Sequence, residues 1–200
     1  MKPLTRAYTL IAAVVLAGIY FQPLWYIALE APQYPEGIEM YIWVNKITGH
    51  EENTLQNINI LNHYIGMQMI EPDSIPELKI FPYIGGLLIL LGLLVWWKNE
   101  PKWMYVYASS LLVLSLLGIF DFWLWEYDYG HNLDPHAAIQ IEGMVYQPPL
   151  LGSKWLLNFK AVSYPHIGGI CLALSCFLMF WAMIHEKWYV RSSRIPTSND

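Results

Sequence analysis

The fold is decided by an uncharged stretch of 18 residues, IFPYIGGLLILLGLLVWW, at positions 80–97. A helix needs about 17–25 mostly apolar residues to cross the hydrocarbon core of a bilayer. Three further apolar runs have a comparable length, at residues 8–29, 103–125 and 162–184. The 200-residue chain is 56% hydrophobic and 14% charged, with a mean hydropathy of +0.31. The sequence therefore predicts an all-α membrane protein, a single domain built as a four-transmembrane-helix bundle.

The cations predict the orientation of this bundle. Lys and Arg precede the first run, occupy the short turn between the second and third, and follow the fourth, at Lys2, Arg6, Lys98, Lys102, Lys187, Arg191 and Arg194. By the positive-inside rule this side is the cytoplasm, so both termini and the tail 185–200 are expected there. The first run is too long for a cleaved leader and is expected to remain as an anchor. The protein is thus placed in a bacterial cytoplasmic membrane.

Two long loops, residues 31–79 and 126–161, then lie outside and are expected to form a small mixed cap. Residues 40–44 (MYIWV) are rich in aromatic and branched side chains and predict a strand. Residues 53–64 carry apolar side chains at three- and four-residue spacing, which predicts a helix lying on the membrane.

The stretch NHYIGMQM at residues 62–69 suggests a metal site within the first loop. A helix would place His63 and Met67 on one face, and an extended chain would point His63, Met67 and Met69 the same way. Imidazole with thioethers suits Cu(I). The alternative is that both methionines are packing residues that cap the bundle, with His63 hydrogen-bonded at the interface.

The second loop offers further candidates. Asp128, His131 and Asp134 recur at three-residue steps and His136 follows, so a mixed carboxylate and imidazole site is one interpretation. Asp-Pro and Tyr-Gly are also turn formers, so local turns are the other. Met144 adds one more exterior thioether.

Two ionisable residues fall at the outer ends of the spans. Asp121 lies near the exterior end of the third run, and His166 about one turn into the fourth. An ionisable group at membrane depth is costly and marks a functional candidate, and a carboxylate that holds an imidazole often supports a metal ligand. The other interpretation is a hydrogen bond that fixes the two helices together.

Sulfur also occurs inside the fourth run. Cys171 and Cys176 are five residues apart, which turns them to different faces of a helix and excludes a disulfide between them. Cys176, Met179 and Met183 share one face. Packing explains this row, and transit of Cu(I) is the alternative.

Several functions are excluded by the motifs. Membrane haem needs histidines on facing helices, and the four apolar runs do not provide such a pair. The sequence also has no C-x-x-C-H, Walker A, G-x-S-x-G or H-E-x-x-H motif. The net charge of −5 argues against nucleic acid. We expect an accessory or binding protein, not an enzyme.

Four runs of the sequence carry a resemblance: residues 31–37 (APQYPEG), 61–67 (LNHYIGM), 129–135 (YGHNLDP) and 146–150 (YQPPL). Together they resemble a family of small bacterial multi-pass membrane proteins encoded near the maturation genes of nitrous oxide reductase, a copper enzyme. The resemblance covers nearly the whole chain. It implies copper handling and transfers no ligand set.

Two functions are compatible with these observations. In the first, the cap binds copper, as Cu(I), in support of copper-enzyme maturation, with ligands drawn from His63, Met67, Met69, Asp121, His131, His136, Met144 and His166. Its partners would be the lipid bilayer and an extracytoplasmic copper protein or maturation complex. In the second, the protein is a structural or assembly subunit that docks a respiratory or maturation complex and binds no metal.

Overall fold

The computed structural model describes residues 1–32, 34–141, 143–156 and 158–192. Four of its helices are long and apolar enough to span a membrane. They are α1 (Pro3–Leu16), prolonged by the 3₁₀ turn η1 (Ala17–Tyr20), then α3 (Glu77–Lys98), α4 (Pro101–His131) and α5 (Ile167–Ser192). We call these four helices the bundle. These four helices are consistent with the predicted multi-pass membrane protein.

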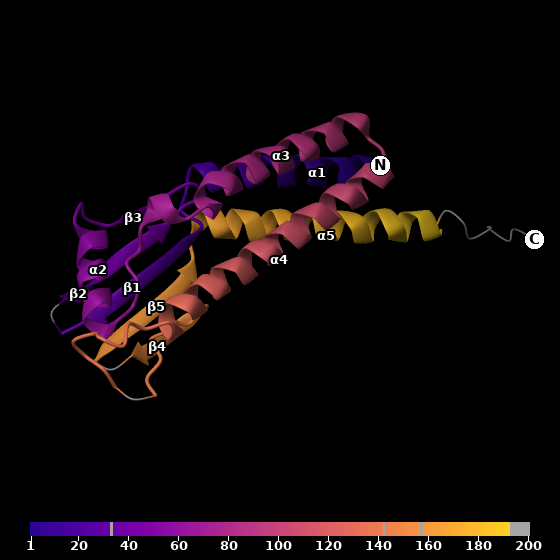
Figure 1. Ribbon diagram of the computed structural model, residues 1–200. Helices are drawn as coiled ribbons and strands as arrows, with labels where there is room; N and C mark the ends of the chain where they lie inside the picture. Colours follow the sequence, from indigo (N-terminus) through magenta and orange to yellow (C-terminus); the bar gives the residue numbers. More distant parts are fainter. Residues whose placement is uncertain (33, 142, 157, 193–200) are drawn as a thin grey trace, which may run out of the picture.

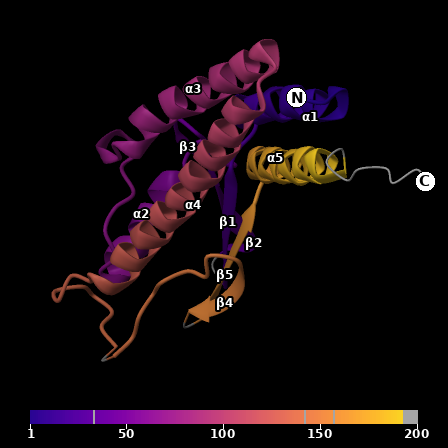
Figure 2. The same ribbon diagram turned by 90° about the vertical axis from the view of Figure 1, so that its right-hand side faces the viewer.

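Each helix of the bundle packs against two others (Figures 1 and 2). α1 lies between α5 and α3, while α4 contacts α3 and α5. Close approach depends on glycine at Gly92 of α3, where an added Cβ would lie 2.8 Å from both Ala13 of α1 and Tyr107 of α4. Small residues at such crossings let membrane helices approach each other.

The prediction of an all-α protein is wrong, because a five-stranded antiparallel sheet continues the bundle at one end (Figure 1). Its strands are β1 (Trp25–Ala31), β2 (Tyr34–Ile42), β3 (Ile47–Gly49), β4 (Gly152–Leu156) and β5 (Phe159–Pro165), in the order β3-β2-β1-β5-β4. The centre of the sheet pairs Tyr26 with Tyr41 on one side and Tyr164 on the other. The structure is 59% helical.

Two of the predicted membrane spans each covered part of a helix together with part of a strand of this sheet. The run 8–29 is helical only to Tyr20, and its last part forms β1. The run 162–184 begins inside β5, and α5 starts at Ile167. A continuous apolar run fits a buried strand as well as a helix, and Pro23 and Pro165 mark the changes between them. The runs at 80–97 and 103–125 lie within the helices α3 and α4, although α4 continues to His131.

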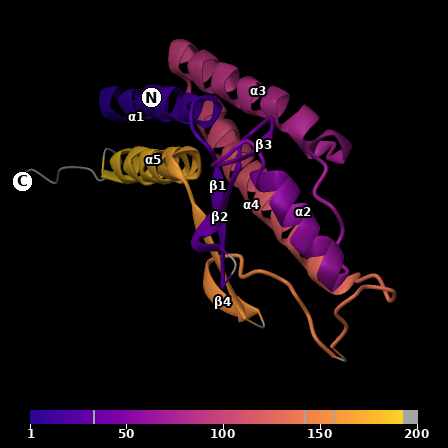
Figure 3. The same cartoon turned by 90° about the vertical axis from the view of Figure 1, so that its left-hand side faces the viewer.

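One face of the sheet is covered by helices (Figure 3). Helix α2 (Thr54–Ile65) packs Ile58 against Ile27, Ile38 and Met40 of the sheet, and Phe122 of α4 joins this second core. The helix predicted at 53–64 is present as α2, but its apolar side packs against the sheet, whereas it was expected to lie on the membrane. The strand expected at 40–44 lies at 34–42, and the loop expected at 126–161 contains the end of α4, all of β4 and the start of β5. We call the sheet, α2 and the segments that join them the cap.

Five basic residues, Lys2, Arg6, Lys98, Lys102 and Lys187, lie at the end of the bundle opposite the cap, while Lys46, Lys79, Lys154 and Lys160 lie in or beside the cap. The Met1 ammonium donates to the Asn99 carbonyl over 2.8 Å, and Arg6 Nε donates to the Trp96 carbonyl over 3.2 Å. The start of α1 thus meets the turn between α3 and α4. Arg194 and the end of the tail lie outside the described residues.

Candidate functional site

The stretch 62–69 is helical only in its first half. Helix α2 ends at Ile65, and Gly66 has φ +80°, the left-handed conformation that glycine adopts readily. The Met67 amide donates to the Asn62 carbonyl over 2.9 Å and the Gly66 amide to the His63 carbonyl over 3.4 Å, which is a Schellman motif. Neither predicted conformation holds throughout, because the backbone reverses between His63 and Met67.

Residues 66–70, which we call the donor loop, are held by side chains of α2 and α4. The Asn59 amide accepts from the Ile70 amide over 2.7 Å and donates to the Ile70 carbonyl over 3.1 Å. Buried Asn62 donates to the Gln68 carbonyl, and Tyr129 donates to the Met69 carbonyl, both over 3.2 Å. The backbone of the donor loop is therefore fixed. The Gln68 and Met69 side chains are exposed, Met67 is half-buried, and Ile70 packs against the core that α2 forms with the sheet.

The second loop closes against the same place. The Asp134 amide donates to the Gly66 carbonyl over 2.8 Å, and the Ile139 amide donates to the Tyr64 carbonyl over 2.9 Å. An added Cβ at Gly66 would lie 2.9 Å from the Asp134 carbonyl oxygen and 3.0 Å from the Ala137 Cβ. Gly66 is thus required both for the turn and for this close approach.

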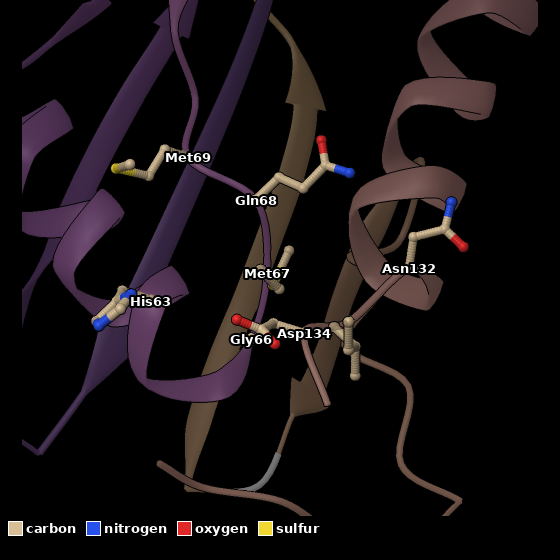
Figure 4. Close-up of a pocket in the computed structure, with 8 residues that line it drawn as sticks. His63, Gly66, Met67, Gln68, Met69, Asn132 and Asp134 are labelled. Carbon is tan, nitrogen blue, oxygen red and sulfur yellow. The ribbon is translucent and has the colours of Figure 1, made fainter. Parts of the chain in front are cut away.

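Between the two loops lies an open hollow of about 380 Å³ (Figure 4). Its lining comprises His63, Gly66, Met67, Gln68, Met69, Asn132, Leu133 and Asp134. Figure 4 shows Met67 and Asp134 at its centre, with the His63 and Met69 side chains to one side of them and Asn132 to the other. Met69 is 58% exposed and His63 is exposed, so neither fills a core. All three predicted ligands of the first loop are therefore at one hollow.

Asp134 gives this hollow a negative charge. The His136 amide donates to Asp134 Oδ1 over 2.8 Å, and His136 Nδ1 lies 3.3 Å from the same oxygen. These contacts, the amide first, hold the pKa of the Asp134 carboxyl below its ordinary value, with a smaller contribution from nearby His63. The ionised carboxylate favours a cation in the hollow.

His131 and Met144 do not line the hollow. His131 Nδ1 lies 2.8 Å from the Tyr127 carbonyl, and its ring stacks on the Tyr127 ring at 3.8 Å between centroids. Met144 is half-buried, and its amide donates to the Ile141 carbonyl. His136 reaches the hollow only through Asp134. The second loop thus contributes mainly Asp134.

Asp121 and His166 are not joined by a hydrogen bond or an ion pair among the described residues. His166 lies between β5 and α5, not inside the helix as expected, and its ring meets Tyr41 edge-on at 5.6 Å. Its Nδ1 is buried without a hydrogen-bond partner in the described part of the chain. Asp121 is half-buried on α4, with Glu77 as its electrostatic neighbour.

The uncovered face of the sheet carries a polar cluster that was not predicted. Glu39 accepts from Tyr26 over 3.0 Å and from Tyr41 over 2.6 Å, and His50 Nδ1 lies 3.6 Å away. The Tyr41 bond, then the Tyr26 bond, lowers the pKa of Glu39. Burial and the bond to Glu39 raise the pKa of Tyr26 to about 12, and the same bond with burial raises the pKa of Tyr41 to about 12.

The described residues contain no group of three or more His, Cys, Asp or Glu side chains placed to hold a metal ion. A metal in the hollow would therefore need the thioethers of Met67 and Met69 beside His63 and Asp134. That donor set suits a soft monovalent ion and lacks the thiolates or additional imidazoles typical of structural zinc.

Sequence reasoning missed the residues that organise the donor loop. In the sequence, Asn59 and Asn62 look like ordinary polar residues of a helix. An Asn on the buried face of a helix nevertheless indicates that its side chain makes a specific hydrogen bond. Gly66 comes just after the predicted helix, and a glycine at that place could have been recognised as the C-terminal cap of the helix.

No protein family, curated protein or solved structure matches the chain. The described residues form four helices able to span a membrane and a five-stranded sheet that continues them at one end.

Proposed function

We propose that this protein is a membrane-anchored accessory protein whose cap binds Cu(I) in support of copper-enzyme maturation. The ligands are His63, Met67 and Met69, with Asp134 as a nearby carboxylate. The observation that carries the proposal is the donor loop itself: its backbone is held by hydrogen bonds from Asn59, Asn62 and Tyr129, while its soft side chains face a hollow.

The exposure of His63 and Met69 supports binding over packing, while Met67 is half-buried. A methionine that caps a core would be buried, whereas Met69 is 58% exposed and belongs to the cap, not the bundle. A fixed backbone also means that little conformational freedom is lost when a metal binds, which favours affinity.

We infer that the cap is extracytoplasmic in a bacterial cytoplasmic membrane. Lys2, Arg6, Lys98, Lys102 and Lys187 lie at the opposite end of the bundle, and the positive-inside rule places that end in the cytoplasm. The cap would then receive copper outside the cell membrane and hold it for an extracytoplasmic partner, without catalysing a reaction.

A docking role without metal is the second candidate. Ile60, Tyr64 and Ile139 are exposed large apolar residues, and the Ile139 amide bonds to Tyr64 at the hollow. Exposed apolar side chains gathered around a hollow are typical of an interaction site. They fit a partner that approaches the hollow, whether or not it exchanges metal there.

Metal content decides between the two functions. The detergent-purified protein, loaded with Cu(I) under anaerobic reducing conditions and desalted, would be compared with the triple variant His63→Ala, Met67→Ala, Met69→Ala. The matched control is His131→Ala with Met144→Ala, which removes an imidazole and a thioether outside the hollow. Copper that disappears only in the triple variant supports the site, and equal copper in all three proteins contradicts it.

Orientation is tested separately with single cysteines in a background lacking Cys171 and Cys176. Gln56 is exposed on α2 and Glu100 is exposed in the turn between α3 and α4. A membrane-impermeant maleimide should label Gln56→Cys from outside intact cells and leave Glu100→Cys unlabelled. The reverse pattern would overturn the extracytoplasmic placement.

A further inference from the structure

The end of the bundle opposite the cap brings cations from three helices to one place. Arg6 lies on α1, Lys98 is the last residue of α3, and Lys102 is in the first turn of α4. The bond from the Met1 ammonium to the Asn99 carbonyl holds the start of α1 beside the turn between α3 and α4 (Figure 1). Within the described part of the chain, no ion pair joins any of these three side chains to a carboxylate. Their combined positive field favours an anion.

The guanidinium of Arg6 is oriented and keeps free donors. Arg6 Nε donates to the Trp96 carbonyl over 3.2 Å, and the guanidinium carbon lies 5.0 Å from the centroid of the Trp96 ring. These two contacts fix the group, while its terminal N–H groups have no acceptor among the described residues. The N–H groups at the end of a guanidinium form a fork that matches a pair of phosphate oxygens. Arg6 is therefore placed in advance for an anion of that shape.

Lys98 provides a second cation next to Arg6. Its Nζ lies 5.1 Å from the centroid of the Trp103 ring, across the turn between α3 and α4. Glu100 is the only carboxylate in residues 98–102, and it is exposed and paired with neither Lys98 nor Lys102. A lysine in this position keeps its apolar stem against the ring and its ammonium at the polar surface.

Exposed tryptophans place these cations at the edge of the bilayer. Trp97 is 69% exposed in the last turn of α3, and Trp103 and Trp188 are exposed on α4 and α5. Tryptophan is enriched at the level of the lipid headgroups, and the 22 residues of α3 have the length of one membrane span. An anion at this level, between an apolar surface and water, is the phosphate of a lipid. Basic pockets between membrane helices bind such headgroups.

We propose that Arg6, Lys98 and Lys102 form a binding site for the phosphate of an anionic phospholipid. The guanidinium of Arg6 holds the phosphate oxygens, and the two lysines add electrostatic attraction. The acyl chains lie along the exposed row Leu87, Leu90 and Leu94 of α3, which ends one turn before Lys98. This site is independent of copper binding by the cap, and it requires no assumption about which compartment faces this end of the bundle.

Lipid binding to the detergent-purified, delipidated full-length protein tests the proposal. Native mass spectrometry would follow titrations with phosphatidylglycerol and with phosphatidylcholine that has the same acyl chains. The variants are Arg6→Gln, Arg6→Lys and Lys98→Gln. Lys46→Gln is the matched control, because Lys46 Nζ also lies over a tryptophan ring, 4.8 Å from the centroid of Trp43, but in the cap.

We expect wild type to retain one phosphatidylglycerol, bound about tenfold more tightly than phosphatidylcholine. Arg6→Gln should weaken that binding about ten- to a hundredfold, because a hydrogen-bonded pair with a charged group is lost. Arg6→Lys, which keeps the charge and loses the fork, should fall between the two. Lys98→Gln should weaken binding about two- to fivefold, as expected for a more exposed ion pair, and Lys46→Gln should not change it.

Three results would overturn the site. They are equal affinity for the two lipids, an equal loss of affinity in Lys46→Gln and Arg6→Gln, and displacement of the lipid by inorganic phosphate at the same concentration, which would indicate a site for a free anion. If Arg6→Gln fails to fold, Lys98→Gln decides, because Lys98 is exposed and makes no hydrogen bond through its side chain within the described residues. Cu(I) loading of Lys98→Gln should equal that of wild type, so failure of the lipid site leaves the copper proposal untouched and failure of the copper site leaves this one.

Discussion

Gly66→Ala should open the contact between the two loops of the cap. Alanine at φ +80° costs about 1–2 kcal/mol, because its Cβ crowds the backbone in the left-handed conformation. The same Cβ would lie 2.9 Å from the Asp134 carbonyl oxygen and 3.0 Å from the Ala137 Cβ, and overpacking of this kind costs about 1–3 kcal/mol. Together these effects predict a loss of about 2–5 kcal/mol in the free energy of unfolding of the cap.

Gly143→Ala separates the two contributions. Gly143 has nearly the same conformation, with φ +75°, but apart from its chain neighbours no atom of the described residues lies within 4 Å of the position that its Cβ would occupy. It should therefore show at most the backbone cost of about 1–2 kcal/mol. The difference between the two variants measures the contact of Gly66 with the second loop.

The assay is equilibrium unfolding in mixed micelles, followed by tryptophan fluorescence, together with hydrogen exchange of individual amides. In Gly66→Ala the amides of Asp134 and Ile139 should lose protection, because they donate to the Gly66 and Tyr64 carbonyls. Sheet amides at Ile27 should keep theirs. Stability within about 0.5 kcal/mol of wild type, with both loop amides still protected, would refute this account of the turn.

Three further substitutions test other parts of the structure. Asn59→Ala should lower stability by about 1–3 kcal/mol in denaturant unfolding, since it leaves backbone groups of the donor loop unpaired, while Asn57→Ala, which breaks no side-chain bond, should not. Glu126 is 5% exposed, and neither of its carboxylate oxygens has a hydrogen-bond partner among the described residues. Glu126→Leu should therefore raise the free energy of unfolding by about 1–3 kcal/mol. A lower free energy of unfolding in this variant would contradict the view that the carboxylate is unpaired. Tyr41→Phe should raise the pKa of Glu39 toward its ordinary value in a carboxyl NMR titration, and an unchanged pKa would contradict the hydrogen bond. Because the Tyr41 pKa is raised from 10.0 to about 12, the stability that it contributes is complete below pH 10 and is lost as pH rises toward 12, so Tyr41→Phe should reduce alkaline destabilisation.

The helices built around an apolar run that no strand interrupts could be predicted from the sequence, and the strands that directly adjoin helices could not. The run at 80–97 has no charge and a spanning length, so α3 was predicted to within three residues at its start and one at its end. In β1, Tyr26 on the uncovered face is nearly as apolar as Ile27 on the covered face, which hides the two-residue alternation of a strand. β1 also pairs with β5, whose Tyr164 is 138 residues from Tyr26, and no local pattern reports such pairing.

The same distinction between local pattern and long-range contact applies to the candidate site. The spacing of His63, Met67 and Met69 brought three soft donors to one hollow because they are close in sequence and α2 ends between them. Asp134 reaches that hollow through a backbone bond to Gly66, a contact across 68 positions that depends on the length and direction of α4. The expected pairing of Asp121 with His166 failed for a related reason, since β5, not a helix, carries the chain up to His166.

The hydrogen bonds around the donor loop separate a binding site from a packing site in physical terms. Packing methionines gain stability by leaving water, so their backbone needs no special restraint and their side chains are buried. In the donor loop the restraint falls on the backbone, through Asn59, Asn62 and Tyr129, while Met69 stays exposed. Ordering a loop costs about 1–2 kcal/mol for each residue that is fixed, and here folding has already met that cost before any ligand arrives. Such an arrangement favours the binding of a ligand to the exposed side chains of the loop. The hollow therefore supports the proposed function more directly than the exposed apolar residues near it do.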